Sequence, residues 1–308
     1  MANYLVTGGA GFIGSHISAE LLKRGHQVRV ADNFVTGYRH NLRDGVELME
    51  ADLADPEAAR RAVEGIDYVL HEAAIPSVPR SVANPVESHK ANVDATLNML
   101  VASRDAKVKR LVFAGSSSVY GDTPSLPKRE DMPHSPLSPY ALHKQLGEQY
   151  AQMFTRLYGF ETVTTRYFNV FGPRQDPSSP YSGVISLFIK ALIEGTQPVI
   201  YGDGGQTRDF TYVANVVDGV LRGAETPGVG GEVFNVATST RVSLNELLEV
   251  LKKIIGSNVQ PIYKEARAGD VRHSQADISK AQQMLGYQPT VGLEEGLRET
   301  VAWYKSTT

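Results

Sequence analysis

The sequence predicts an α/β protein built on a doubly wound parallel sheet, followed by a smaller mixed α/β lobe. In the first half of the 308 residues, short apolar and partly β-branched runs alternate with helical stretches. That alternation places helices on both faces of a parallel sheet. A glycine-rich turn joins the first run to the first helical stretch, which is the pattern of a Rossmann-type domain. After about Val170 the alternation stops.

The elements of the first lobe are expected in chain order. The predicted strands cover residues 4–7, 28–32, 47–51, 68–71, 110–114 and 161–166. The predicted helices cover residues 15–24, 56–63, 85–103 and 139–158. These elements define a first domain over residues 1–170, and a late strand near 232–237 is expected to return to its sheet.

The smaller lobe is expected over residues 171–308. It opens on loop-like sequence, because glycine, proline and serine dominate residues 172–180. Helical patterns then cover residues 185–194, 244–255 and 293–304.

Composition narrows the class of protein. The chain has no cysteine, so we expect neither disulfides nor a thiolate metal site, and we predict no metal. The formal net charge is −3 and no basic stripe is present, which disfavours a nucleic-acid partner. We find no apolar run long enough to span a membrane and no secretory signal at the N-terminus, so a cytoplasmic protein is expected.

The glycine-rich turn predicts a dinucleotide site. Gly8, Gly11 and Gly14 follow the first strand with the spacing G-x-x-G-x-x-G. Glycine permits a tight turn and lets a pyrophosphate approach the backbone, while the next helix offers free N–H groups. Asp32 ends the second strand about 20 residues on, where a carboxylate accepts hydrogen bonds from a ribose diol. Because it would repel a 2′-phosphate, we expect NAD rather than NADP.

A Tyr–Lys pair predicts the catalytic group. Tyr140 and Lys144 lie one helical turn apart in the helix expected from Pro139. A tyrosine hydroxyl has a pKa of about 10, and a nearby ammonium group together with the positive nicotinamide ring would lower it toward that of a useful base. Serines 116–118 directly follow the fifth strand, so their hydroxyls are expected beside the ligand crevice.

With these elements the chain resembles the extended short-chain dehydrogenase/reductase superfamily, and within it the UDP-hexose 4-epimerases. The resemblance covers nearly the whole chain. It includes the stretches Asp32-Asn33, His71-Glu72-Ala73-Ala74, Arg166-Tyr167-Phe168-Asn169-Val170-Phe171-Gly172-Pro173, Thr207-Arg208-Asp209-Phe210 and Arg267-Ala268-Gly269-Asp270. One departure is Glu72, where the family usually has an apolar residue.

The resemblance implies the roles of individual residues. Tyr140, Lys144, Ser116 and Ser117 would be catalytic. The NAD site would comprise Gly8, Gly11, Phe12, Ile13, Gly14, Asp32, Asn33, Asp52, Leu53, Ala73, Ala74, Asn92, Tyr140, Lys144 and Tyr167. The UDP-sugar would contact Arg80, Ser118, Asn169, Tyr201, Arg208, Arg267, Asp270 and Ser274.

The residues of the serine turn distinguish between the reactions that similar enzymes catalyse. The dehydratases that resemble this chain carry an Asp-Glu pair where Ser117 and Ser118 stand, and the decarboxylases tend to carry a carboxylate at the place of Ser118. A further related class uses a cysteine, which this chain lacks. What remains is oxidation and re-reduction at one carbon, a 4-epimerisation through a transient 4-keto sugar.

The substrate is inferred from one position. In similar epimerases, the residue seven places beyond the second phosphate-binding arginine lines the sugar pocket, and here it is Ser274. A small residue admits an N-acetyl group, so UDP-GlcNAc/UDP-GalNAc is favoured, with possible activity on UDP-Glc/UDP-Gal. Arg80 and Arg174 leave UDP-glucuronate 4-epimerisation, or action on another nucleotide sugar, open. A non-catalytic NAD(H) sensor is the alternative class, and the resemblance implies a homodimer through helices 85–103 and 139–158.

Overall fold

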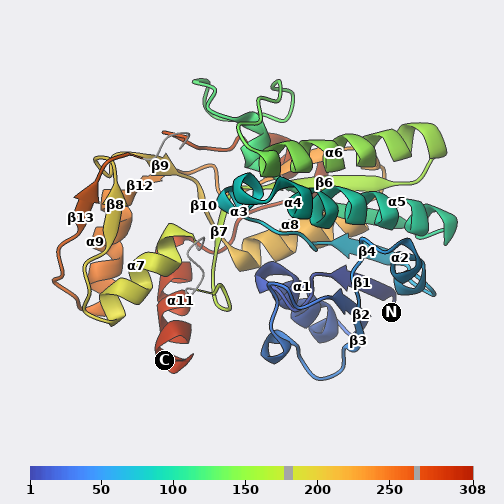
Figure 1. The fold of residues 1–308 in the computed structure, drawn as a ribbon, viewed down its shortest axis with the longest axis horizontal. Coiled ribbons are helices and arrows are strands. Elements are labelled where there is room, and N and C mark those ends of the chain that lie inside the picture. The colour runs from blue at the N-terminus through green and yellow to red at the C-terminus, as the bar shows by residue number, and fades with distance from the viewer. Residues whose placement is uncertain (177–182, 267–270, 308) are drawn as a thin grey trace.

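The computed structural model describes residues 1–176, 183–266 and 271–307 and has two lobes of unequal size (Figure 1). The larger lobe holds the N-terminus and the central sheet, and the smaller lobe holds the C-terminus. Within the three described ranges, none of the helices has both the length and the apolar character that crossing a membrane requires.

The central sheet has seven strands, all parallel, in the order β11-β6-β5-β4-β1-β2-β3. They are β1 (Asn3–Thr7), β2 (Gln27–Asp32), β3 (Glu47–Glu50), β4 (Tyr68–His71), β5 (Arg110–Ser116), β6 (Thr162–Tyr167) and β11 (Val233–Val236). The strand order reverses between β1 and β4, which opens a crevice at their carboxyl ends. The predicted doubly wound sheet is therefore confirmed.

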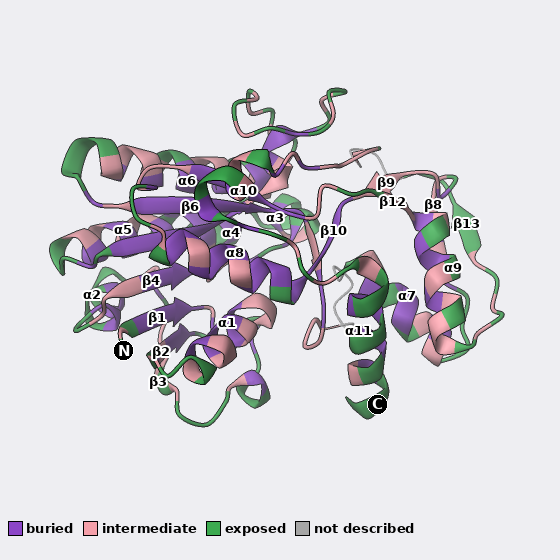
Figure 2. Ribbon diagram, turned by 180° about the vertical axis from the view of Figure 1, so that it is seen from behind, coloured by how far each residue is buried: buried purple, intermediate pink, exposed green. Residues whose placement is uncertain are grey.

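Helices cover both faces of this sheet, and side-chain alternation along the strands explains why. Tyr4 and Val6 of β1 are buried with one set of helices, whereas Leu5 between them is buried with the other. The first set is α1 (Phe12–Lys23), α8 (Val213–Glu225) and α10 (Ser279–Leu285), and the second is α2 (Pro56–Ala62), α5 (Ala95–Asp105) and α6 (Pro139–Tyr158). Figure 2 shows buried strands between helices whose outer faces are exposed.

The smaller lobe has its own apolar core. Helices α7 (Val184–Ile193), α9 (Leu244–Ile255) and α11 (Leu293–Thr307) surround it. Short two-stranded sheets complete the lobe: β7 (Asn169–Phe171) with β10 (Phe210–Tyr212), β9 (Thr207–Arg208) with β12 (Val242–Ser243), and β8 (Val199–Tyr201) with β13 (Ile262–Lys264).

The structure differs from the sequence-based expectation in two places. The core of the larger lobe continues past residue 171, because α8 and α10 pack into it in addition to β11, the late strand that was expected near residues 232–237. The single helix expected over residues 85–103 is divided into α4 (Pro85–His89), a π-helical turn η2 (Lys90–Asp94) and α5. A short helix α3 (Val78–Ala83) precedes them. Single π turns often mark functional sites, and η2 borders the crevice described next.

Candidate active site

A cavity of about 850 Å³ lies at the carboxyl ends of the central strands. It occupies the reversal point between β1 and β4, where open α/β sheets bind their ligands. The predicted residues among its lining are Gly8, Gly11, Phe12, Ile13, Gly14, Asp32, Asn33, Asp52, Leu53, Ala73, Ala74, Arg80, Ser116, Tyr140, Lys144 and Tyr167. The fold thus brings the glycine turn and the Tyr–Lys pair to one cavity.

The glycine turn is held by its own backbone. Gly8 has a φ of +67°, and its N–H donates to the carbonyl of Ala31 at 2.8 Å. A side chain at Gly8 would come within 2.8 Å of the Ala73 nitrogen, so the turn lies directly against the chain that leaves β4. Because these positions carry no side chain, the backbone of Gly8, Gly11 and Gly14 lines the cavity directly.

Asp32 is positioned by the same turn. Its carboxylate accepts hydrogen bonds from the N–H of Ala10 at 2.9 Å and of Phe34 at 2.8 Å. A carboxylate has about four lone-pair sites, so acceptor capacity remains for a ribose diol. Together with the helix α1 N-terminus that begins beside Gly11, these groups fit NAD.

Two alanine substitutions in the glycine turn separate cofactor binding from folding. A Cβ at Gly11 would meet only the Gly8 oxygen, at 3.1 Å, whereas one at Gly14 would lie 2.3 Å from that oxygen. We expect Gly11→Ala to weaken NAD binding by about tenfold or more, ~1.4 kcal/mol, with a nearly unchanged Tm. Gly14→Ala should lower the Tm itself. Calorimetric titration with NAD and thermal unfolding measure the two effects, and equal loss of Tm in both variants would contradict this account.

Helix α6 carries the Tyr–Lys pair into the cavity. Ser138 caps its start by accepting from the N–H of Ala141, and Pro139 occupies the first turn. A side chain at Gly147 would clash with the ring of Phe113 at 2.4 Å, so glycine there allows α6 to lie close against β5. The ammonium of Lys144 then donates to the carbonyl of Ala114 at 2.8 Å.

The serine turn meets this helix from the end of β5. Ser116 pairs in register with Tyr167 of β6, and its hydroxyl is hydrogen-bonded to that of Tyr140. The hydroxyl of Ser116 also lies 2.8 Å from that of Ser118. Ser117 begins a short 3₁₀ helix, η3 (Ser117–Tyr120), and does not line the cavity among the residues described.

Burial is the largest influence on the pKa values of Tyr140 and Lys144. It raises the pKa of Tyr140 to about 12, with the charge of Glu72 acting in the same direction and the Ser116 hydrogen bond opposing it. Burial also lowers the pKa of Lys144, against the charge of Glu72. The protein's own residues therefore do not give the lowered tyrosine pKa expected from sequence.

Unlike the other predicted cofactor residues, Asn92 is not among the described residues that line the first cavity. Its side-chain oxygen accepts from the N–H of Ile75 at 2.8 Å, and its amide donates to the carbonyl of Ile75 and to Ser88. It thereby fixes the loop that follows β4, of which Ala73 and Ala74 line the cavity.

Most of the predicted sugar-nucleotide residues lie in or next to the smaller lobe. Asn169 pairs in register with Phe210, and Arg208 donates to the carbonyls of Thr207 and Arg272. Ser274 is joined to the same strand, because its N–H donates to the carbonyl of Thr207 at 3.1 Å. Tyr201 ends β8. Arg267 and Asp270 fall outside the described residues.

Other cavity residues were not predicted from sequence. The Tyr38 hydroxyl donates to Asp176 at 2.6 Å, which connects the loop after β2 with the segment entering the smaller lobe. Both residues line the cavity, as do Gln175 and Glu72. The loop residues carry no periodic signal, whereas Glu72 is visible in the sequence as a charged residue directly after an apolar strand.

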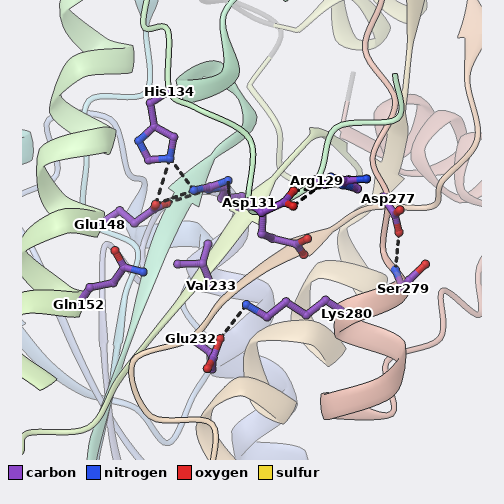
Figure 3. A pocket seen from close by; sticks show the side chains of 12 residues that line it. Arg129, Asp131, His134, Glu148, Gln152, Glu232, Val233, Asp277, Ser279 and Lys280 are labelled. Atoms are coloured by element: carbon purple, nitrogen blue, oxygen red, sulfur yellow. Dashed lines mark hydrogen bonds and ion pairs between the residues drawn. The ribbon is translucent and has the colours of Figure 1, made fainter. Parts of the chain in front are cut away.

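A second cavity, of about 450 Å³, lies between α6, β11 and α10 (Figure 3). Its wall is made of paired charges. Glu148 contacts His134 and Arg166, and Lys280 is paired with Glu232 at 2.7 Å. Arg166, part of the stretch noted in the sequence, therefore lies in this network and not in the first cavity. Across the described ranges, no group of three or more His, Cys, Asp or Glu side chains is placed to hold a metal ion.

Comparison with known proteins shows the family of the chain. Residues 4–237 match the model of the NAD dependent epimerase/dehydratase family. The chain is 39% identical over 309 residues to a UDP-glucose 4-epimerase of Mycolicibacterium smegmatis, covering 98% of each.

Solved structures of similar proteins have nearly the same fold. A UDP-N-acetylglucosamine 4-epimerase from Methanobrevibacter ruminantium, in complex with UDP-N-acetylmuramic acid, superposes with a TM-score of 0.96 at 40% identity. The match covers 100% of this chain and 99% of that one. A UDP-glucose 4-epimerase from Thermotoga maritima with UDP-glucose gives a TM-score of 0.96 at 39% identity, covering 99% of each chain.

Proposed function

Because the chain belongs to the NAD dependent epimerase/dehydratase family, we propose that it catalyses the NAD-dependent 4-epimerisation of a UDP-hexose. The observation that carries this proposal is the shared cavity. Tyr140, Lys144 and Ser116 line the same space as the glycine turn and Asp32, so a sugar hydroxyl can meet the catalytic group beside the cofactor.

Each of the three residues has its own role in the proposed reaction. Tyr140 takes the proton of the sugar 4-hydroxyl and later returns it. Ser116, hydrogen-bonded to Tyr140, holds the reacting oxygen, and Lys144 supplies a positive charge from the same helix face. NAD, when bound, supplies the hydride acceptor for C4 and a cationic ring. Net inversion requires the 4-keto sugar to present its opposite face before reduction, so the diphosphate must be held more firmly than the sugar.

We propose that Asn169, Arg208, Arg267 and Asp270 hold the UDP part, with Tyr201 near the base. Guanidinium groups suit phosphate oxygens because they donate two parallel hydrogen bonds. Arg208 lies on strand β9, and the backbone N–H of Ser274 is hydrogen-bonded to the same strand. Elimination is disfavoured because Ser117 and Ser118 offer neither a carboxylic acid to protonate a leaving hydroxyl nor a carboxylate to remove a proton from carbon.

We propose UDP-GlcNAc/UDP-GalNAc as the substrate pair, with possible activity on UDP-Glc/UDP-Gal. Ser274 is the basis, since its small side chain leaves room for an N-acetyl group. The alternative, UDP-glucuronate, would use Arg80 for the sugar carboxylate. The guanidinium of Arg80 is already paired with Glu87, which offsets its charge and weighs against this alternative.

Ser274→Tyr tests the choice of sugar. A tyrosine would fill the space for the N-acetyl group, so kcat/KM for UDP-GlcNAc should fall by about tenfold or more, ~1.4 kcal/mol, while UDP-Gal is spared. Ser274→Ala is the matched control and should keep both activities. An unchanged ratio of the two kcat/KM values in the tyrosine variant would remove Ser274 from the argument.

We also propose a homodimer in which each protomer contributes the helical segment over residues 85–103, which spans α4, η2 and most of α5, together with α6. Val86 of α4 is 79% exposed and Leu142 of α6 is 45% exposed, and the two helices pack against each other. Apolar side chains exposed together on neighbouring helices are typical of an interaction surface. Sedimentation velocity over a range of protein concentrations would test this.

The function itself is tested by incubating the purified protein with UDP-GlcNAc, UDP-Glc and UDP-glucuronate separately and following the sugar H1 and H4 signals by proton NMR. A galacto-configured product from one of them would establish the reaction and its substrate. If NAD is bound and none of the three changes, nor a CDP- or dTDP-linked sugar, the NAD(H)-sensing alternative takes its place.

A further inference from the structure

Glu72 places a carboxyl group inside the catalytic cavity. It directly follows β4, and its N–H donates to the carbonyl of Thr7 at 3.3 Å. Its side chain accepts a hydrogen bond from the Tyr167 hydroxyl at 2.7 Å, and both residues line the same cavity as Tyr140 and Lys144. The half-buried carboxyl is therefore held at the wall of the cavity that contains the Tyr–Lys pair.

Several titratable and charged groups surround Glu72, and its charge affects the pKa values of Tyr140 and Lys144. Tyr140 and Lys144 of α6 line the same cavity and interact electrostatically with Glu72, and Tyr167 of β6 is hydrogen-bonded to it. Arg80, Glu87 and Lys90 line the same cavity from α3, α4 and η2. His71, on β4 itself, is buried and interacts with Lys144.

Burial and charge act against each other in this group. Burial raises the pKa of Glu72 and lowers that of Lys144, whereas their mutual attraction opposes both shifts. The Tyr167 hydrogen bond helps Glu72 to remain charged. In turn, the charge of Glu72 raises the pKa of Tyr140.

We propose that Glu72 is a positioning residue of the Tyr–Lys pair, one that is held by Tyr167 and sets the charge that Tyr140 and Lys144 experience. This inference rests on the proposed epimerase function for its kinetic consequences. The charge of this carboxyl group would therefore be expressed in the pH dependence of catalysis.

The direction of the effect follows from the two interactions. Tyr140 must lose its proton to act as a base, and the Glu72 carboxylate makes that loss harder. Lys144 must keep its proton, and the same carboxylate helps it to do so. Without the charge at position 72, both limbs of the pH–rate profile should move to lower pH, by about one pH unit each, which is the shift that one nearby charge typically produces.

The kinetic test compares Glu72→Gln, which keeps a hydrogen-bond acceptor, with Glu72→Leu, which introduces an apolar side chain. Both should move the whole kcat profile to lower pH. Glu57→Gln is the matched control, because Glu57 is a 55% exposed carboxylate that does not line the cavity among the residues described, and its profile should not move. A Glu72→Gln profile that coincides with that of the wild type overturns the proposal. If neither Glu72 variant folds, Tyr167→Phe should give a smaller shift in the same direction, and no shift there overturns it equally.

A spectroscopic test does not depend on turnover. Phenolate absorbance of the NAD-loaded protein is followed from about pH 6 to about pH 12, because burial raises the pKa of Tyr140 to about 12, and the spectrum of the matching Tyr140→Phe protein is subtracted. The Tyr140 phenolate should form at lower pH in Glu72→Gln than in the wild type. Superimposable curves overturn the proposal even if the protein turns over UDP-sugars. A shifted curve supports it even if the epimerase assay fails, in which case only the proposed function is lost.

Discussion

Tyr140→Phe is expected to lower kcat for epimerisation by about 10³-fold, the usual contribution of a positioned acid–base group. The substitution removes only the hydroxyl oxygen, at the position where the structure hydrogen-bonds it to Ser116. Binding of the UDP-sugar should change little, because the proposed diphosphate contacts come from the smaller lobe. Single-turnover kinetics and calorimetric titration with the UDP-sugar measure the two quantities separately.

The matched control is Ser116→Ala, which removes the hydroxyl on the other side of the same hydrogen bond. It should reduce kcat by a smaller factor, since Tyr140 would still exchange the proton. Normal turnover by Tyr140→Phe would refute the mechanism, whereas loss of both turnover and UDP-sugar binding would show that the tyrosine serves binding as well.

The parts of this site that could be predicted from sequence are those with local geometry. Tyr140 and Lys144 lie one turn apart on any helix, and a glycine turn between a strand and a helix needs no distant partner. Asp32 was likewise found because it ends a strand at a fixed distance from that turn.

The remaining features depend on long-range contacts. Helix α8 joins the larger lobe although it lies far along the chain, because Val216 and Val220 pack into the core shared with β1. The bond between Tyr38 and Asp176 joins residues 138 positions apart, and no pattern in either loop signals it. Glu72 was visible as an unusual residue, but its neighbours Tyr167 and Lys144 appear only once β4, β6 and α6 are assembled.

Arg166 belongs to a stretch that carries the resemblance, and its contacts become visible only in the folded chain. Its guanidinium makes a two-point contact with Glu148, at 2.8 and 2.6 Å, and donates to the Tyr120 hydroxyl at 2.7 Å. Tyr120 ends the 3₁₀ turn that starts at Ser117. Arg166 therefore supports the serine turn through its hydrogen bond to Tyr120.

Glu148→Ala is expected to destabilise the protein by about 3–5 kcal/mol, because it leaves the Arg166 charge buried without its partner. Both side chains of this pair are only 2% exposed, so water cannot replace the lost contact. Urea denaturation measures the change in the free energy of unfolding. The comparison variant is Glu57→Ala, which breaks an ion pair with Arg60 whose side chains are 55% and 63% exposed, and it should cost less than about 1 kcal/mol.

A double variant decides whether the charge or the packing matters. Replacing both partners, as in Glu148→Leu with Arg166→Met, removes the pair without leaving a charge behind, and buried pairs replaced in this way are often neutral in stability. The double variant should therefore recover much of the stability lost in Glu148→Ala. It should still turn over more slowly than the wild type, since Tyr120 loses the guanidinium that fixes the serine turn beside Tyr140. Full recovery of both stability and turnover would mean that Arg166 does not position that turn.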